Sequence, residues 1–368
     1  MTVIDMHNHF IAPEVIDFLA REGRRYATRI VERDGRRFFL IKESALRPID
    51  GAISNADARI ADMDREGIAM QAVSCVPFLM YPEVAPDLGL AIAQVNNDSL
   101  AALAVRDDRH FVPLASVPLQ NPAMASKELE RAAKIGLRGV EIPPKVEERQ
   151  LDEAEFEVFW EAAEALQMAV CIHPFEAAPT GALARYFLGN LVGNLYDTGL
   201  AAALLIYGGV LERHPKLRIV LYHAGGALPA LIGRLDMGYR LIPECRAAIP
   251  RPPSSYVARF YFDIIAHNRE LLGHLVKTHG ADRFVVGSDY PLPAGLAHPV
   301  EEVRALGLTR PTKRRFCRST RESSCGSPDQ SAAERSVSLS QLAAVEPDKV
   351  TAEALKDWHY WVAQGYLF

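Results

Sequence analysis

The sequence predicts a (β/α)8 TIM barrel, because short apolar strands alternate with helical patterns along most of its 368 residues. The candidate strands are rich in Val and Ile and lack polar alternation, which is typical of parallel strands covered on both faces. Each is followed by sequence of helical character. The eight candidate strands are 3–9, 70–77, 110–117, 138–143, 168–173, 218–223, 260–265 and 284–289.

The helical patterns between these strands have recognisable ends. The first pattern begins after Asn55, a good N-cap residue, and ends at Gly67, a good residue for the left-handed position after a helix. A doubly wound open sheet is the alternative fold, but no glycine-rich phosphate loop follows the first strand. The other helical patterns cover about 84–106, 121–135, 152–166, 227–240 and 268–279.

Two insertions interrupt the alternation. Residues 24–43 contain two β-like runs around Asp34-Gly35, a hairpin turn signal, and the excursion ends in Leu46-Arg47-Pro48. We therefore expect a small β insertion above the barrel, at about 14–50. The second insertion, about 175–200, carries Pro, Gly and aromatic residues in a long connection after the fifth strand. We expect it to form a lid or an interface element.

The composition changes near the end of the chain. From about Arg310 the sequence is rich in Ser and Arg and lacks apolar periodicity, so we expect a disordered or linker-like tail. The predicted division is a barrel over 1–308 and an atypical tail over 309–368, with an amphipathic helix within 351–368. An authentic extension and a shifted reading frame both account for such a tail.

Composition limits the classes of partner. A net charge of −5 shows no polyanion-binding signature, so we expect no nucleic acid partner. No uninterrupted apolar run approaches the roughly 20 residues that span a bilayer, so we expect no membrane partner. The N-terminus opens on a strand, without a basic and apolar leader, and we expect a cytoplasmic protein. The five cysteines have no CxxC spacing, and Cys75 and Cys171 are expected to be reduced and buried.

Histidines and one aspartate stand at the strand ends. His7 and His9 end the first strand, and side chains two apart in a strand point to the same side. His173, His223 and Asp289 end the fifth, sixth and eighth strands. Each could separately be a capping or surface residue. In a (β/α)8 barrel, however, the carboxyl ends of the strands form one rim, so their joint placement predicts a shared metal site.

Several ordered motifs carry a resemblance over about residues 1–308. The chain resembles the amidohydrolase superfamily, and within it the metal-dependent decarboxylases related to 2-amino-3-carboxymuconate-6-semialdehyde decarboxylase. Beyond about 308 the resemblance ends in the Ser/Arg-rich tail. The matching motifs are MHNHF (6–10), CIHP (171–174), LYHAGG (221–226), VVGSDYP (285–291), ALRP (45–48), RIADMDREGI (59–68), VPLQNP (117–122), LIGRLD (231–236) and RPPSSYV (251–257).

The resemblance implies a mononuclear metal centre. The cation would be divalent, most often Zn²⁺, with Mn²⁺ as an alternative, because three imidazoles and a carboxylate suit such ions. Glu141 and Lys145 stand where binuclear relatives bridge two metals, but we interpret them as non-ligands because Pro143 and Pro144 occupy the turn. The residues expected to hold the metal are His7, His9, His173 and Asp289.

The resemblance also implies roles for three further residues. His223 matches the family's catalytic histidine, which exchanges a proton next to the metal. Arg47, in ALRP, matches an arginine that binds the substrate carboxylate, and Arg234, in LIGRLD, matches one that reaches into a neighbouring subunit's site. Without the motif context, each arginine would be taken as part of a surface salt bridge. If Arg234 acts in this way, the active protein is a homodimer.

These residues predict a metal-dependent, non-oxidative decarboxylase of a small conjugated or aromatic carboxylic acid. Either His223 or the metal ligand Asp289 would supply the proton that replaces CO₂. A second hypothesis is hydrolysis of an amide, lactone or ring C–C bond by the same centre. A third is a non-catalytic barrel with a structural metal, which the presence of His223 and Arg47 disfavours.

Overall fold

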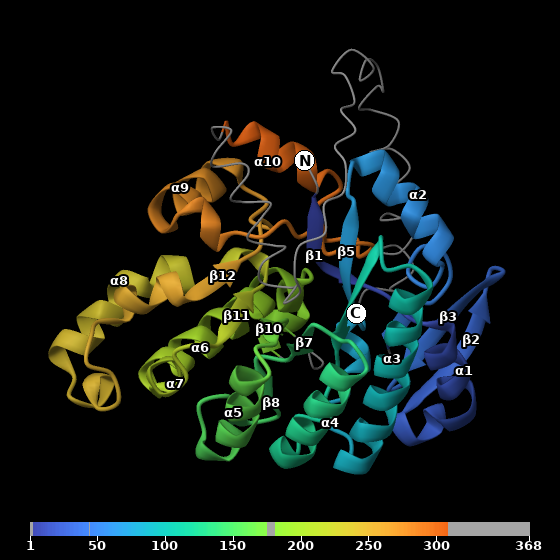
Figure 1. Ribbon diagram of the computed structural model, residues 1–368, viewed down its shortest axis with the longest axis horizontal. Coiled ribbons are helices and arrows are strands. Elements are labelled where there is room, and N and C mark those ends of the chain that lie inside the picture. Colours follow the sequence, from blue (N-terminus) through green and yellow to red (C-terminus); the bar gives the residue numbers. More distant parts are fainter. Residues whose placement is uncertain (1–2, 44, 175–180, 308–368) are drawn as a thin grey trace.

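The computed structural model describes residues 3–43, 45–174 and 181–307, and in these residues a single curled sheet forms the centre of the molecule (Figure 1). Its seven strands pair in parallel in the order β1-β5-β6-β7-β10-β11-β12. The strands are β1 (Ile4–His9), β5 (Met70–Ser74), β6 (Phe111–Ala115), β7 (Gly139–Ile142), β10 (Ala169–Ile172), β11 (Arg218–Leu221) and β12 (Phe260–Phe262).

An eighth extended segment, residues 284–290, closes the sheet into a barrel. Phe284 bridges to Phe262 at one side, and Tyr290 bridges to Asn8 at the other, both in parallel. The backbone N–H of Val285 donates to the carbonyl of Phe262, and that of Met6 donates to the carbonyl of Val286, each at 2.8 Å. The predicted strand at 284–289 therefore lies between the first and seventh barrel strands, and the predicted barrel is confirmed.

Helices cover the outside of the sheet (Figure 1). The predicted ends of the first barrel helix are confirmed. The side chain of Asn55 accepts from the backbone N–H groups of Asp57 and Ala58 at 3.0 and 3.1 Å, and Gly67 is left-handed at φ 71°. The barrel helices are α2 (Ala56–Glu66), α3 (Pro86–Arg106), α4 (Pro122–Lys134), α5 (Glu157–Ala165), α6 (Asn194–Tyr207), α7 (Val210–Arg213), α8 (Leu228–Leu241), α9 (Arg269–His279) and α10 (Pro299–Ala305).

Two apolar layers hold the barrel together. The larger one lies between the sheet and the helices, and includes Trp160, Phe159 and Leu205, all fully buried. The smaller one fills the barrel interior with side chains from five strands and the segments next to them. Its buried members are Ile4, Met6, Ala72, Val112, Leu114, Cys171, Val220, Tyr222 and Val285.

The first insertion contains the predicted hairpin. β2 (Thr28–Arg33) and β3 (Arg36–Ile41) pair antiparallel, with Asp34 at φ 52° and Gly35 at φ 72° in the two-residue turn. β4 (Ala45–Pro48) adds a third strand. The insertion also contains a helix that the sequence analysis missed, α1 (Pro13–Glu22), which packs its buried face on α3.

The second predicted insertion, about 175–200, is partly a barrel helix. Residues 181–184 and 189–193 form short helical turns, and α6 begins at Asn194. The sequence analysis missed this start because α6 is buried over much of its surface and so lacks a regular alternation of polar and apolar faces. The predicted tail at 309–368 and its helix within 351–368 lie outside the described residues.

One helix in the described ranges, α3, is by length and composition apolar enough to cross a membrane. In the fold it packs against β6 on one side and α1 on another, with Ile92, Leu100 and Leu103 buried. This packing explains the apolar composition of α3.

Candidate metal centre

Four of the predicted residues meet at the carboxyl ends of the barrel strands. His7 and His9 belong to β1, His173 directly follows β10, and Asp289 lies in the closing segment 284–290. All four are buried, and each offers one ligand atom within 4.8 Å of the others. Residues far apart in the sequence are thus brought together, and a divalent metal site is present.

A register shift in β1 aims the two histidines into the barrel. Ile4 and Met6 point into the interior, so strict alternation would turn His7 and His9 outward. The pairing with β5 shifts between Asp5 and Asn8, as a β-bulge does, and the odd-numbered side chains then face the interior.

A fully buried arginine supports this part of β1 from α2. Arg59 donates to the side chains of Asn8 and Gln71 at 3.0 and 2.7 Å, and also to the carbonyl of His9. Its guanidinium lies 4.8 Å from the ring centroid of Tyr290 in the closing segment. Arg59 therefore connects β1 and the closing segment, two of the three segments that carry ligands of the metal site, to the helix layer.

Hydrogen bonds fix the three ligand imidazoles through their Nδ1 atoms. Nδ1 of His7 lies 2.7 Å from Oδ2 of Asp263, and Nδ1 of His9 lies 3.0 Å from the carbonyl of Cys75. Nδ1 of His173 lies 2.7 Å from the carbonyl of Pro174. Because these oxygens only accept, each Nδ1 carries the proton, and each Nε2 keeps its lone pair for a cation.

The atoms that remain are buried and unpartnered within the described residues. They are Nε2 of His7, of His9 and of His173, and Oδ1 of Asp289. The Asp289 oxygen lies 3.3 Å from Nε2 of His7, 3.0 Å from that of His9 and 4.0 Å from that of His173. Buried polar atoms without partners are costly, and a divalent cation would satisfy all four.

The charges of the centre are strongly coupled. Burial alone would lower the pKa of His7, but Asp289 and Asp263 raise it to about 10. Burial would raise the pKa of Asp289, but the surrounding histidines hold it well below its usual range. Burial lowers the pKa of His173 well below its ordinary value. A cation needs an ionised carboxylate and neutral imidazoles as ligands, so its binding would displace the second proton from His7.

His223 lies beside the centre without being one of its four ligands. It begins a short turn after β11, where His223 and Ala224 are both left-handed at φ 55° and 54°. Its Nε2 lies 3.7 Å from Oδ2 of Asp289, and its side chain is 15% exposed, whereas that of His7 is fully buried. His223 is therefore on the accessible side of the centre, as a proton-transfer residue must be.

The sequence analysis missed Asp263, which follows β12. This fully buried carboxylate contacts His7 and accepts from the backbone N–H groups of His223, Ala224 and Ile265. Hydrogen bonds from His7 hold its pKa below the usual range, although burial alone would raise it. The available signal was a single carboxylate in the otherwise apolar strand end Phe260–Ile265.

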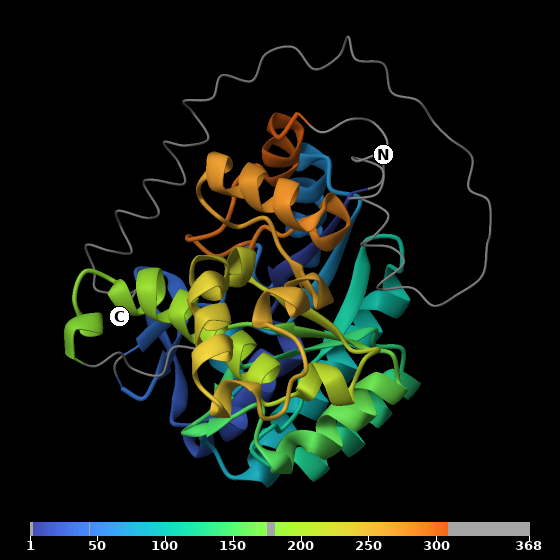
Figure 2. The same cartoon turned by 90° about the vertical axis from the view of Figure 1, so that its left-hand side faces the viewer.

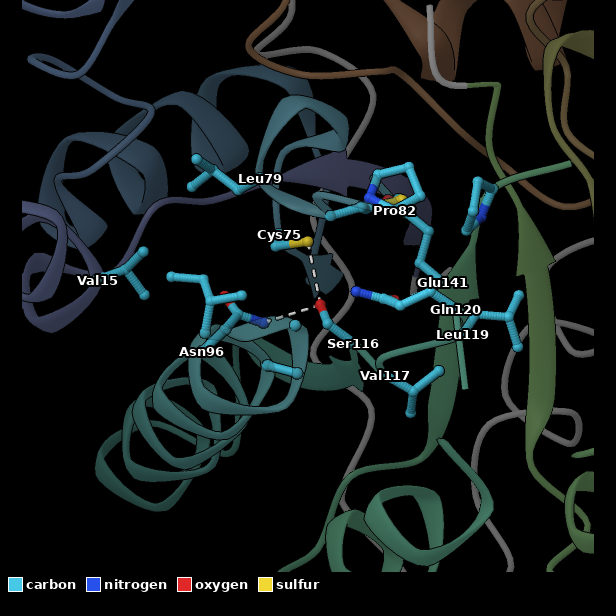
Figure 3. A pocket seen from close by; sticks show the side chains of 15 residues that line it. Val15, Cys75, Leu79, Pro82, Asn96, Ser116, Val117, Leu119, Gln120 and Glu141 are labelled. Atoms are coloured by element: carbon cyan, nitrogen blue, oxygen red, sulfur yellow. Dashed lines mark hydrogen bonds between the residues drawn. The ribbon is translucent and has the colours of Figure 1, made fainter. Parts of the chain in front are cut away.

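Glu141 and Lys145, interpreted as non-ligands, lie outside the four-residue group. Glu141 accepts from Ser74 at 2.7 Å, and burial raises its pKa. It also lines a small cavity of about 10 Å³, room for about one water molecule, beside the hydrogen-bonded pair Ser116 and Cys75 (Figure 3). Lys145 pairs with Asp197 at 3.3 Å.

The two predicted substrate arginines lie on β4 and α8. Arg47 lies on β4, and its guanidinium is 5.8 Å from the ring centroid of Phe78, in the loop after β5. Arg234 is exposed on α8. In the described part of the chain, no hydrogen bond or ion pair joins Arg234 to the four metal-site residues.

Known proteins resemble this chain over most of its length. The sequence profile of a family described as amidohydrolase matches residues 4–320. A 2-amino-3-carboxymuconate-6-semialdehyde decarboxylase from Dictyostelium discoideum is 32% identical over 269 residues, which cover 73% of this chain and 75% of that relative. A second profile, described as calcium binding, matches residues 322–362, outside the described residues.

Two solved structures share the fold. A 5-carboxyvanillate decarboxylase from Sphingomonas paucimobilis has a TM-score of 0.74 at 24% identity, covering 88% of this chain and 98% of its own. A dihydroxybenzoic acid decarboxylase from Polaromonas sp. JS666, with bound manganese and the inhibitor 2-nitroresorcinol, has a TM-score of 0.69 at 23% identity, covering 88% and 97%.

Proposed function

The chain belongs to the amidohydrolase family, as its motifs predicted, and from this membership we propose that it is a metal-dependent, non-oxidative decarboxylase of a small aromatic or conjugated carboxylic acid. The observation that carries the proposal is the set of four buried, unpartnered ligand atoms with His223 beside them. The relatives named above are decarboxylases of acids of this kind.

We propose Zn²⁺ as the resident cation, because three imidazole nitrogens and one carboxylate oxygen suit it. Mn²⁺ is the alternative, since the Polaromonas decarboxylase binds manganese. When bound, the cation supplies a Lewis acid for anionic oxygens of the substrate.

In the proposed reaction, the bond between the carboxylate carbon and the substrate breaks, and its electron pair stays on the substrate carbon. CO₂ leaves, and one proton takes its place. His223 donates this proton, because its ring lies on the accessible side of the centre and its Nδ1 has no partner within the described structure. Asp289 remains a metal ligand throughout.

Arg47 and Arg234 would recognise the carboxylate. A guanidinium binds a carboxylate through two parallel hydrogen bonds, which orients the group that leaves. Arg47 is proposed to act from β4, close to the Phe78 ring. Arg234, exposed on α8, is proposed to act in the site of a second subunit.

A homodimer in the cytoplasm is the assembly that we propose. The segment around 181–196 projects from the barrel (Figure 2) and exposes five large apolar side chains. Such a gathering of apolar surface is typical of an interface. The five residues are Leu183, Tyr186, Leu191, Val192 and Tyr196.

Product analysis tests the reaction. Zn²⁺- or Mn²⁺-loaded protein is incubated in D₂O with hydroxylated benzoic acids and carboxylated vanillic acids. We expect CO₂ together with one deuterium at the vacated carbon, and no net uptake of water. A ring-opened acid would instead support hydrolysis, and no turnover of any acid of this class would refute the proposal.

A variant tests the role of His223. His223→Ala should keep its metal and lose turnover by about 10²–10⁴-fold, the usual contribution of a general acid. His274→Ala, which changes an exposed histidine on α9, is the control and should keep full activity. Full turnover in His223→Ala would exclude the assigned role.

A further inference from the structure

Asp263 contacts both a metal ligand and the proposed proton donor. We propose that Asp263 is a positioning residue that sets the metal-binding tautomer of His7 and holds the backbone at His223, so that one carboxylate orients both. The metal-binding half of this inference is independent of the proposed reaction. The half that concerns His223 rests on the proposed function.

The contacts use the full acceptor capacity of the carboxylate. Oδ2 lies 2.7 Å from Nδ1 of His7 and 2.9 Å from the backbone nitrogen of His223. Oδ1 accepts from the backbone N–H groups of Ala224 at 2.7 Å and of Ile265 at 3.0 Å. An ionised carboxylate accepts about four hydrogen bonds and donates none, so four donors match it completely.

The contact with His7 determines which nitrogen faces the metal. An acceptor at Nδ1 keeps the proton there and leaves the lone pair on Nε2, which is one of the unpartnered atoms of the centre. Tyr222 stacks on the same ring, with centroids 3.6 Å apart and planes 6° apart. The ring can therefore neither rotate nor exchange its two nitrogens while Asp263 is in place.

The contacts with His223 and Ala224 hold the backbone of these two residues in an unfavourable conformation. Two consecutive residues with side chains are left-handed here, and neither is Gly or Asn. Asp263 binds the N–H group of each. The carboxylate thus stabilises the strained backbone conformation that places the His223 ring beside the centre.

The isosteric change Asp263→Asn separates this role from simple packing. An amide replaces one acceptor oxygen by an NH₂ group, which cannot accept. If the NH₂ group replaces Oδ2, it forces the proton of His7 onto Nε2 and opposes the N–H of His223. If it replaces Oδ1, it opposes the N–H groups of Ala224 and Ile265. Either orientation of the amide therefore removes hydrogen bonds at His7 or at the backbone turn of His223.

Zn²⁺ affinity measured by competition with a chromophoric chelator is the first readout. We expect Asp263→Asn to bind Zn²⁺ about 10–100-fold more weakly than the unchanged protein, as is usual when the partner of a ligand histidine is lost. Glu128→Gln changes another buried carboxylate, which lies on α4 and accepts from Asn97 of α3 and Arg131 of α4, and it should leave Zn²⁺ affinity unchanged. Unchanged Zn²⁺ affinity in Asp263→Asn, together with unchanged hydrogen exchange at the amides of His223 and Ala224, would overturn the inference.

A second measurement uses the unchanged protein, so it does not depend on whether Asp263→Asn folds. In the unchanged, Zn²⁺-loaded protein, NMR should show a slowly exchanging Nδ1–H proton on His7 and slow hydrogen exchange at the amides of His223 and Ala224, although these lie in an irregular turn. An Nε2–H tautomer of His7, or fast exchange at both amides, would refute the inference. Loss of CO₂ release with every acid would refute only the proposed reaction, because Zn²⁺ affinity is measured without substrate.

Discussion

Adding one methyl group at Gly287 should disrupt the metal centre. A Cβ at this position would lie 2.9 Å from the Cβ of His7 and 2.9 Å from that of Asp263, and all three residues are buried. Ordinary contacts at a Cβ are 3.4–4 Å, so strands on both sides must separate by at least half an ångström. Overpacking of this kind costs about 1–3 kcal/mol of the free energy of unfolding. The displacement also reaches the tolerance of about 0.5 Å within which a site retains its function.

Two measurements on Gly287→Ala test this reasoning. We expect a lower midpoint in urea unfolding and a weaker affinity for Zn²⁺, because the added methyl group pushes His7 away from Asp263. Gly273→Ala on α9 is the matched control, since its added Cβ meets only Leu306 at 3.9 Å and should gain up to about 1 kcal/mol from helix propensity. Wild-type stability and Zn²⁺ affinity in Gly287→Ala would show that the contact is not restrictive.

The metal-free protein should lose stability as the pH rises from about 6.5 towards about 10. The pKa of His7 is raised to about 10 in the folded state, so its stabilising contribution is complete below the unfolded value of about 6.5 and disappears as the folded group loses its proton. Urea titrations of chelator-treated protein at several pH values measure how the free energy of unfolding changes with pH. His7→Gln should reduce this change. An identical change in the variant would assign the pH dependence to other groups. Leu191→Glu should convert the proposed homodimer to a monomer in sedimentation velocity, because Leu191 is 53% exposed on the projecting segment. Val105→Glu, at an 85% exposed position on α3, should leave the dimer intact, and a dimeric Leu191→Glu would place the interface elsewhere.

Local sequence patterns were sufficient to predict the barrel and a shared site at its strand ends, whereas the choice of the four metal ligands came from the resemblance to the family. Apolar runs predict parallel strands, and the carboxyl ends of such strands meet at one rim. His173 and Asp289 could therefore be grouped with His7 without knowledge of any contact. Their convergence within 4.8 Å bears out this inference.

Features that depend on contacts between distant residues could not be predicted in this way. The register shift between Asp5 and Asn8 arises from pairing with β5, and no turn residue marks it. The role of Asp263 depends on the proximity of His7 and the His223 turn, which approach it from other strands. The sequence shows only an isolated acidic residue at this position.

The placement of three of the four ligands on the first and last barrel segments has a consequence for biosynthesis. His7 and His9 emerge from the ribosome early, whereas Asp289 emerges only after all seven strands of the sheet. A nascent chain therefore cannot offer the full ligand set until the ring of strands is ready to close. A bound cation would then link the two edges of the newly made sheet. A truncated product that ends before residue 289 lacks this link.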